Sequence, residues 1–150
     1  RVALKDENLV SIISATIGYL KTRTSSKISF VFDSDTSPTV IIPLNAALFE
    51  WAIENLSKNA IDAMEGNGII TYRISETDNN VHVDISDTGK GIPKGAFKKI
   101  FSPGYTTKQR GWGLGLSLTK RIVEEFHKGK IYVRHSEPGI GSSIRIALNK

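Results

Sequence analysis

Segments whose apolar residues recur with helical or strand spacing constrain the fold of this chain more than any other feature. Three segments show helical spacing, namely residues 7–20, 43–64 and 114–126. Six shorter segments alternate like strands, namely residues 27–32, 39–42, 69–74, 81–86, 130–135 and 142–148. Because neighbouring strands are interleaved with three long helices, we predict an α+β fold in which a mostly antiparallel sheet carries the helices on one face.

Two helix starts and one apolar helix face follow from local residue preferences. Asp6 is a candidate N-cap for the first helix. Pro43 suits the first position of the second helix, because proline has no N–H to leave unpaired there. In the third helix, Leu118, Ile122 and Phe126 are spaced to share one face.

Length and composition exclude several classes of protein. The 150 residues, 39% hydrophobic and 23% charged, are expected to form one globular domain, residues 1–150. The absence of cysteine excludes disulfide scaffolds, thiol catalysis and zinc fingers. No apolar run approaches the ~20 residues of a membrane span. The first residue is Arg1 rather than Met, so we expect a fragment of a longer protein.

Glycine and positive charge are concentrated in one stretch of the chain. Seven of the 13 glycines lie within residues 89–115, and residues 94–134 contain ten Lys or Arg but only two Glu. Glycines let backbone N–H groups approach a ligand closely. A basic segment favours a polyanionic partner, which can be a nucleic acid, an acidic membrane surface or the phosphates of a nucleotide.

A polar stripe borders the buried face of the second predicted helix. Asn55, Asn59 and Asp62 lie within about 60° of one another at 100° per residue. Side-chain amide oxygens are suitable ligands for the hard cation Mg²⁺. The alternative is that these side chains only bridge or cap polar groups at the edge of the core.

Two glycine motifs follow the apolar strand that ends near residue 86. In the first, Asp87 can accept a hydrogen bond from an exocyclic amine, while Gly89 and Gly91 let a planar ring lie close to the backbone. The alternative is an ordinary Asp-x-Gly turn. The second motif, residues 111–116, opens a helix whose unpaired N–H groups favour an anion. The alternative there is a flexible hinge; neither the dinucleotide fingerprint nor a P-loop is present.

In order and spacing, these motifs resemble the histidine-kinase branch of the GHKL family, which has the Bergerat ATP-binding fold. The resemblance covers about residues 7–149 and rests on five motifs. Glu54 to Ala60 is similar to the N box, Asp87 to Gly91 to the G1 box, and Phe97 to Phe101 to the F box. Residues 111–116 are similar to the G2 box, and residues 139–142 to the last glycine motif.

This resemblance implies a two-layer α/β sandwich that binds ATP and Mg²⁺. Asn59 would hold Mg²⁺, Asn55 would contact phosphate beside it, and Asp87 would read the adenine amino group. Residues 94–112 would form a lid over the nucleotide. The implied catalytic residues are Asn55, Asn59 and Lys108. The implied nucleotide-binding residues are Asn55, Lys58, Asn59, Asp62, Asp87, Gly89, Gly91, Ile92, Phe101, Thr106, Thr107, Lys108, Arg110, Gly111, Gly113, Leu114, Gly115, Leu116 and Ser142.

Two positions depart from the family pattern. Trp112 occupies the middle of the G2 box, where Thr or Ser is usual, which puts a side-chain phosphate contact there in doubt. Asp62 stands where some members have a phosphate-binding Lys. That contact is therefore absent, or Lys58 replaces it.

The resemblance also implies partners that this chain does not contain. None of His82, His127 and His135 lies in the helical context of a phosphoacceptor histidine, so we expect the phosphoacceptor hairpin upstream of Arg1. The expected partners are ATP, the dimerisation and phosphoacceptor helices of the same kinase and, indirectly, a response-regulator receiver domain. We expect a cytoplasmic domain that neither inserts into a membrane nor binds nucleic acid, whether or not the parent protein is membrane-anchored.

Phosphate transfer to histidine is the leading hypothesis, and the runner-up is an ATP hydrolase or ATP-driven clamp of the same fold. Hydrolases of this fold carry a Glu four residues before the metal-binding Asn, whereas this chain has Asn55 there. Glu54 is adjacent but rotated by about 100° around the helix. A third hypothesis, a nucleic-acid-binding module, predicts a steep salt dependence and explains none of the N-box residues.

Overall fold

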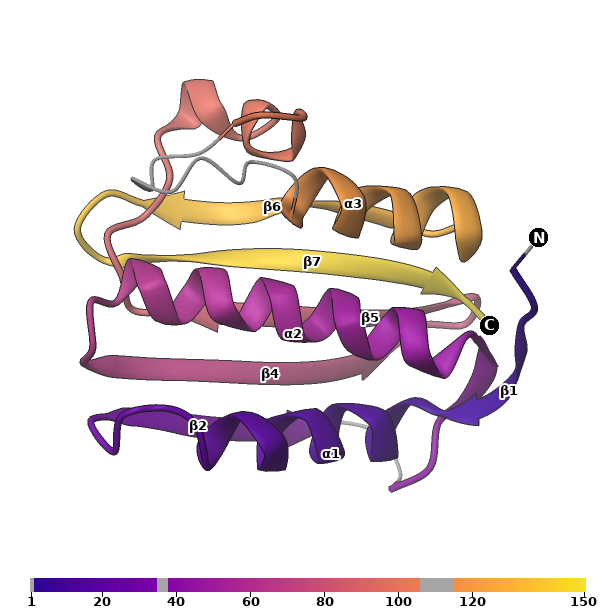
Figure 1. Ribbon diagram of the computed structural model, residues 1–150. Helices are drawn as coiled ribbons and strands as arrows, with labels where there is room; N and C mark the ends of the chain where they lie inside the picture. Colours follow the sequence, from indigo (N-terminus) through magenta and orange to yellow (C-terminus); the bar gives the residue numbers. More distant parts are fainter. Residues whose placement is uncertain (1, 35–37, 106–114) are drawn as a thin grey trace.

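A five-stranded sheet with helices on one face forms the body of the protein (Figure 1). The computed structural model describes residues 2–34, 38–105 and 115–150. In chain order the elements are β1 Lys5–Asn8, α1 Leu9–Lys21, β2 Ile28–Ser34, β3 Ile41–Leu44, α2 Ala46–Ala63, β4 Gly68–Glu76, β5 Asn80–Asp87, the 3₁₀ turns η1 Lys94–Ala96 and η2 Lys99–Phe101, α3 Gly115–Arg121, the π-helical turn η3 Ile122–Phe126, β6 Lys130–Glu137 and β7 Gly141–Asn149.

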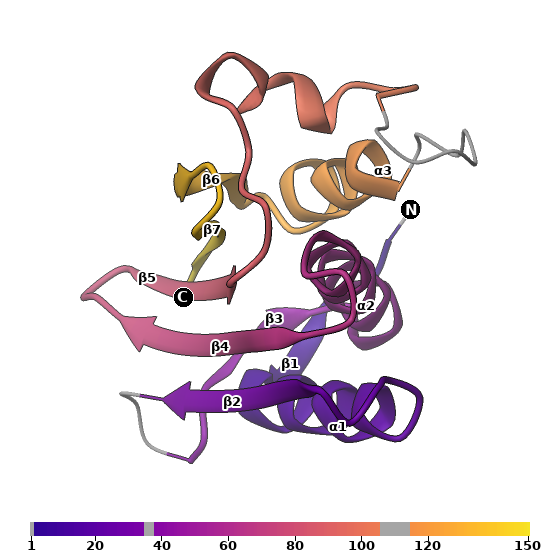
Figure 2. The ribbon, with the colours of Figure 1, turned by 90° about the vertical axis from the view of Figure 1, so that its left-hand side faces the viewer.

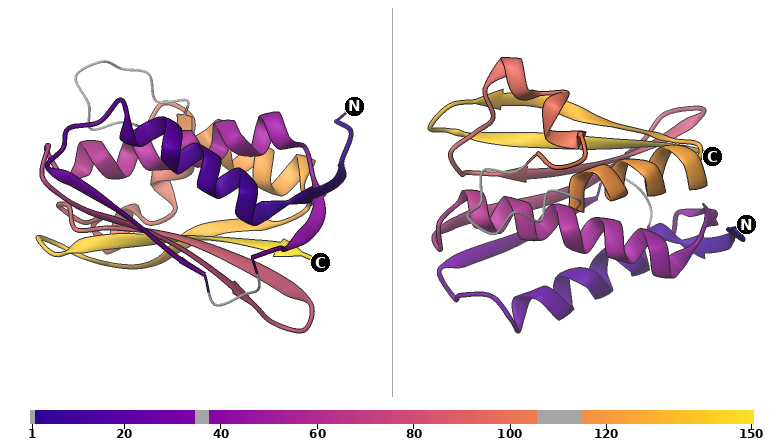
Figure 3. Two further views of the ribbon diagram at one scale, coloured as in Figure 1. Left: turned by 90° about the horizontal axis from the view of Figure 1, so that it is seen from below. Right: turned by 45° about the horizontal axis from the view of Figure 1, so that its top comes forward.

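The main sheet is mixed and mostly antiparallel, as predicted. Its strand order is β2-β4-β5-β7-β6. β2 and β4 pair in parallel, and the pairings β4–β5, β5–β7 and β7–β6 are antiparallel. The helices α1, α2 and α3 lie along one face of this sheet (Figures 2 and 3). The predicted α+β fold, a two-layer sandwich, is therefore confirmed.

The core lies between α2 and the inward-facing residues of β4, β5 and β7. Strand residues alternate between core and outer face, and the buried apolar residues of these strands are Ile70, Tyr72, Ile74, Val81, Val83, Ile85, Ile146 and Leu148. Tyr72 is fully buried, and its hydroxyl donates a 2.6 Å hydrogen bond to Ser57 Oγ on α2. Burial raises the pKa of Tyr72 to about 12, although the hydrogen bond with Ser57 opposes the rise. This bond connects α2 to the middle of the sheet.

Both predicted helix starts are wrong, because Asp6 and Pro43 belong to strands. They lie opposite each other in a two-stranded antiparallel ladder formed by β1 and β3. Asn8 caps α1 instead, with Oδ1 accepting from the N–H groups of Val10 and Val40 at 3.1 Å. β1 was not predicted from the sequence, because its four residues have no alternating pattern and pair only through a distant partner.

The third helix ends differently from the prediction. α3 passes into the π-helical turn η3, and the buried residues of the two are Thr119, Ile122 and Val123. Leu118 is 40% exposed, at a cleft of about 650 Å³ between η2 and α3. Phe126 is only half-buried. The face centred on Thr119 is buried because α3 packs against α2 through that residue.

His127 connects the end of η3 to the start of α2. The buried ring accepts a 3.0 Å hydrogen bond at Nε2 from the backbone N–H of Asn45, the N-cap of α2. Its Nδ1 lies 2.9 Å from the carbonyl oxygen of Ile122, and its edge contacts Phe49. Because an N–H donates to Nε2, the ring is neutral and carries its proton on Nδ1, donated to Ile122.

The outer face of the sheet carries a row of charged and polar residues, one from each strand. Asp33, Arg73, Asp84, Arg145 and Tyr132 are each opposite the next in the strand register. Arg145 donates to both carboxylate oxygens of Asp84, from Nε at 2.7 Å and from Nη2 at 2.8 Å. Arg73 binds Asp33 at 2.9 Å. The alternating charges make this face polar while the opposite face packs on the helices.

Candidate nucleotide site

Asn55 lies on the side of α2 that faces α3. Its Nδ2 donates a 3.0 Å hydrogen bond to Thr119 Oγ1, and Thr119 Oγ1 donates to the carbonyl oxygen of Gly115 at 2.8 Å. The Asn55 amide also lies flat against Gly115: a Cβ added there would be 2.8 Å from Nδ2 and 2.9 Å from Oδ1. The first turn of α3 therefore packs directly against the predicted N box.

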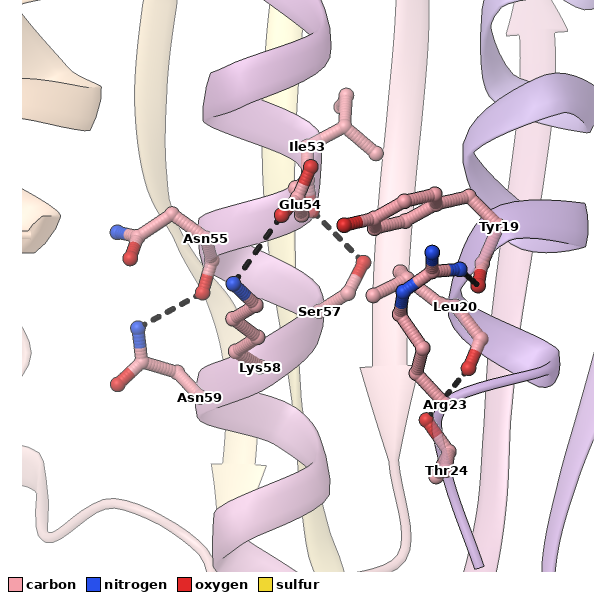
Figure 4. A network of polar contacts seen from close by, with 10 residues as sticks. All are labelled: Tyr19, Leu20, Arg23, Thr24, Ile53, Glu54, Asn55, Ser57, Lys58 and Asn59. Carbon is pink, nitrogen blue, oxygen red and sulfur yellow. Dashed lines mark hydrogen bonds and ion pairs between the residues drawn. The ribbon is translucent and has the colours of Figure 1, made fainter.

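Asn59 follows one turn later on the same side of α2 (Figure 4). Its Nδ2 donates to the backbone carbonyl of Asn55 at 2.9 Å. A carbonyl oxygen only accepts, so this contact assigns the nitrogen and oxygen of the Asn59 amide. The Asn59 Oδ1 is turned away from the helix backbone, and an amide oxygen is a ligand that Mg²⁺ accepts.

Asp87 is the last residue of β5, and both of its carboxylate oxygens accept hydrogen bonds. Oδ1 accepts from the backbone N–H of Gly89 at 2.8 Å, and Oδ2 accepts from Ser142 Oγ at 3.0 Å. Burial raises the pKa of Asp87, and these hydrogen bonds oppose the rise. A carboxylate has about four lone-pair positions, so Asp87 can still accept from a bound amine. Ser142, a predicted nucleotide-binding residue, orients this carboxylate from β7.

The loop after Asp87 is held against the end of α2. The backbone N–H of Lys90 donates to the carbonyl oxygen of Ala63 at 3.1 Å. A Cβ on Gly89 would lie 2.5 Å from that same oxygen. Gly91 has φ +82°, and a Cβ there would lie 2.6 Å from the carbonyl oxygen of Glu137. Packing within the protein thus requires both glycines, independently of their predicted contact with adenine. The loop brings Asp87 to the part of α2 that follows Asn59.

Lys58 and Asp62 are the two other predicted nucleotide-binding residues on α2. Lys58 Nζ pairs with Glu54 at 3.1 Å and is largely exposed. Lys58 and Asp62 both line a pocket of about 290 Å³ between α1 and α2, beside Tyr19 and Arg23. Figure 4 shows Lys58 reaching toward Glu54, while Asn55 and Asn59 point to another side of the helix. Lys58 is therefore on a different side of α2 from the two asparagines. Asp62 lies on their side by helical spacing and also borders this pocket. The nucleotide contacts of both residues stay predictions.

Some of the remaining predicted nucleotide-binding residues lie in the described part of the chain, and others lie outside it. The backbone N–H of Ile92 donates to Ser136 Oγ at 2.6 Å. Phe101 is buried, and Leu116 packs against the same core. Seven predicted residues lie outside the described part of the chain, and their roles stay predictions: Thr106, Thr107, Lys108, Arg110, Gly111, Gly113 and Leu114.

Thr119 contacts a predicted site residue, although the sequence motifs did not identify it. It is fully buried and contacts Asn55, which lies 64 residues earlier in the chain. A lone threonine four residues after Gly115 is a weak local signal, since helical threonines commonly bond the carbonyl of residue i−4. Only the packing of α3 on α2 reveals its second contact.

Together these residues offer two kinds of recognition along one side of α2. Asp87 presents a carboxylate that can accept from an exocyclic amine, and Asn55 and Asn59 present amide groups suited to phosphate and a hard cation. The donors and acceptors present therefore fit a purine nucleotide with a divalent cation.

Comparison with known proteins places this chain in one family. Residues 45–150 match the family described as histidine kinase-, DNA gyrase B-, and HSP90-like ATPase. The chain belongs to this family of ATP-binding domains. The resemblance to the catalytic ATP-binding domain of sensor histidine kinases is confirmed by the relatives and by the solved structures.

Two curated relatives and one solved structure illustrate the similarity. Sporulation kinase A of Bacillus subtilis (strain 168) is 33% identical over 143 residues, which are 95% of this chain and 23% of that protein. Signal transduction histidine-protein kinase AtoS of Escherichia coli (strain K12) is 33% identical over 149 residues, 97% of this chain and 22% of that protein. The nucleotide-free catalytic domain of histidine kinase ThkA superposes with a TM-score of 0.89 at 28% identity, covering 99% of each chain.

The chain is thus much shorter than these curated relatives. It spans under a quarter of Sporulation kinase A and of AtoS. None of the helices in residues 2–34, 38–105 and 115–150 is both long and apolar enough to cross a membrane.

Proposed function

We propose that this domain binds Mg·ATP and transfers the γ-phosphate to a histidine on a separate helical hairpin of a two-component sensor kinase. The proposal is supported by the family of the chain and by relatives named as histidine kinases that match it over nearly its whole length. In this reaction the protein contributes positioning and charge stabilisation rather than covalent chemistry.

In this proposal, one group of described residues binds the adenine and another binds the phosphates with Mg²⁺. Asp87 accepts from the adenine amino group, and Ser142 and Gly89 hold its carboxylate in place. Asn59 supplies an oxygen to Mg²⁺, and Asn55 contacts phosphate beside it. The cation, when bound, neutralises charge on the phosphate oxygens. Lys108 and Arg110 are proposed as further phosphate contacts.

The observation that favours phosphate transfer over ATP hydrolysis is the identity of residue 55, an asparagine, and its hydrogen bond to Thr119. This residue stands where a hydrolase of the fold has a Glu to activate water. An amide is no general base, and its Nδ2 is already committed to Thr119. Glu54, the adjacent carboxylate, pairs with Lys58 at 3.1 Å instead of turning to the Asn59 side. A base must reach the proton that it removes, so this arrangement favours attack by a partner histidine over attack by water.

The partners follow from the same proposal. The acceptor is a histidine on the dimerisation and phosphoacceptor helices, and a response-regulator receiver domain then takes the phosphate. The ThkA kinase has been crystallised in complex with the response regulator TrrA, and this chain matches 42% of that ThkA chain with a TM-score of 0.85. We place the domain in the cytoplasm, where ATP and receiver domains are available.

A chimera tests the proposed transfer. The chain is joined to the histidine-bearing hairpin of Sporulation kinase A and incubated with ATP labelled at the γ-phosphate, with Mg²⁺ or with EDTA. We expect label on the hairpin histidine, recognised because it is lost in acid and kept in base, and only with Mg²⁺. Replacing the hairpin histidine with Gln is the control. Rapid release of free phosphate, with no labelled protein, would instead support the hydrolase alternative.

A further inference from the structure

We infer that Thr119 is a positioning residue of the nucleotide site: it fixes the orientation of the Asn55 amide and couples the first turn of α3 to the N box. This inference rests on the proposed function, because it concerns what Asn55 presents to Mg·ATP. Thr119 is not among the residues expected to touch the nucleotide. It acts through Asn55.

The hydroxyl proton of Thr119 decides the orientation of the amide. A threonine hydroxyl has one proton, and that proton is donated to the carbonyl oxygen of Gly115 at 2.8 Å. Toward Asn55, Oγ1 can therefore only accept. The Asn55 atom 3.0 Å away must be the nitrogen, which leaves Oδ1 on the side away from Thr119. Flipping the amide would place two oxygens together, or would take the proton from Gly115.

Burial makes this preference effective. Thr119 is fully buried, so water cannot enter between the two oxygens if the amide turns. The hydroxyl would still donate to Gly115, but it would face an amide oxygen across a buried contact with no proton between the two oxygens. Gly115 closes the amide on a second side, since any Cβ there would meet both of its terminal atoms. The amide is therefore held by a hydrogen bond and by packing.

The orientation of the Asn55 amide matches that of the neighbouring Asn59 amide. Figure 4 shows the Asn55 and Asn59 side chains projecting from the same side of α2. Nδ2 of Asn59 is directed to the Asn55 carbonyl at 2.9 Å, so both amides have a nitrogen engaged with protein. Their oxygens are then set toward the phosphate and cation end of the site. Because both amides are already oriented, less conformational entropy is lost when Mg·ATP binds.

Three variants isolate this contact. Thr119→Val keeps shape and burial but removes both the acceptor and the donor of residue 119. Thr119→Ser keeps the hydroxyl. Thr16→Val is the matched control, because Thr16 is also a buried helical threonine whose Oγ1 donates to the carbonyl four residues earlier, at 2.9 Å on Ile12. It differs in having no contact with Asn55 in the hydrogen bonds of the described residues.

The measurements are the affinities for ATP with Mg²⁺ and with EDTA, the affinity for adenosine, and the melting temperature. We expect Thr119→Val to weaken Mg·ATP binding by about three- to tenfold and to leave adenosine binding within about twofold, because Asp87 is untouched. Thr119→Ser should restore Mg·ATP affinity. Thr16→Val should lower the melting temperature as much as Thr119→Val does, while retaining Mg·ATP affinity.

The outcomes separate this inference from the proposed function. If wild-type protein binds Mg·ATP and Thr119→Val binds it equally well, Thr119 has only a structural role and the inference is overturned while the proposed function stands. The same holds if Thr119→Val and Thr16→Val weaken ATP and adenosine binding alike. If wild-type protein binds no ATP at all, both are overturned.

Discussion

At the scale of single residues, the candidate site contains a carboxylate whose burial disfavours its ionised form. Asp87 keeps its carboxylate partly buried at the end of β5, where burial raises its pKa. A carboxyl group whose pKa is higher in the folded protein than in the unfolded chain stabilises the fold in its protonated form. This contribution to the free energy of unfolding is complete below the pKa of the unfolded chain. That contribution is lost as the pH rises through the higher folded pKa. At neutral pH the charge of Asp87 is therefore a cost to folding, which a ligand that binds the carboxylate can offset.

Replacing Asp87 separates ligand binding from stability. Asp87→Asn should lower ATP affinity at least tenfold, because a charge-assisted hydrogen bond is worth ~1.5–3 kcal/mol. Its melting temperature at pH 7 should be unchanged or higher, since the buried charge is gone while Oδ1 can still accept. ATP titration and thermal unfolding measure the two effects. Asp33→Asn, on the outer face of the sheet, is the control. Unchanged ATP affinity in Asp87→Asn would refute the adenine role.

The ATP affinity of the wild-type protein should depend on pH in a defined direction. Protonation removes the charge that accepts from the adenine amine, so affinity should fall as the pH drops through the raised pKa of Asp87. Calorimetric titrations across the acid range measure this, with Asp87→Asn as the comparison. A fall of equal size in that variant would assign the pH dependence to another group.

Asn59 tests the metal site. Asn59→Ala should remove the difference between ATP binding in Mg²⁺ and in EDTA, because it deletes the oxygen proposed to bind the cation. The fold should persist, since Asn59 is only half-buried and borders the core. Binding titrations and melting temperatures distinguish this result from a collapse in stability, which would show that Asn59 is structural.

At the scale of elements, α2 connects most parts of the molecule. Its N-cap backbone is bound by His127, its middle by Tyr72 through Ser57, its polar side by Thr119, and its end by the loop at Lys90. These contacts come from the residue after η3, from β4, from α3 and from the segment after β5. The position of the two asparagines is therefore determined jointly by elements far apart in the sequence.

His127 should be a large contributor to this connection. His127→Ala leaves the N–H of Asn45 and the carbonyl of Ile122 without their partner and opens a space beside Phe49. We expect a loss of about 2–4 kcal/mol in the free energy of unfolding, measured by denaturant titration. His135→Ala, at an exposed position on β6, should change it by less than about 0.5 kcal/mol. Equal effects of the two would contradict this role of His127.

The row of charges on the outer face predicts a contrast between two arginines. Arg145→Met leaves the carboxylate of Asp84, 2% exposed, without its partner, and should cost about 3–5 kcal/mol. Arg73→Met breaks only an exposed pair with Asp33 and should cost about 0.2–1 kcal/mol. Denaturant titration measures both, and ATP affinity should be unchanged because the site lies across the sheet. A small effect of Arg145→Met would mean that Asp84 finds another partner or water.

At the scale of the whole molecule, the described structure supports a nucleotide site but lacks a partner for the reaction. The chain alone should bind ATP and release phosphate far more slowly than the ~10 s⁻¹ typical of dedicated enzymes. A coupled phosphate-release assay at saturating Mg·ATP measures this. Turnover near that typical rate would favour the hydrolase alternative and would call for a base other than Asn55.

Local patterns were sufficient for the site residues that lie on one element. Helical spacing alone placed Asn55 and Asn59 on one side of α2, because 3.6 residues per turn fixes which side chains are neighbours. The position of Asp87 at a strand end likewise followed from the apolar run before it. The loop glycines were recognised from spacing, although the reason for Gly89 is the carbonyl of Ala63 against which it packs.

By itself, then, the sequence determined the layers of the fold, the polar stripe of α2 and the family to which the chain belongs, because periodicity and motif order are local properties. Only the tertiary structure decided the contacts between distant segments. Register placed Ser142 on Asp87, helix packing placed Thr119 on Asn55, and strand pairing converted Asp6 and Pro43 from expected helix starts into opposite residues of a ladder. Each of these depends on how elements pack and pair, which no local pattern encodes.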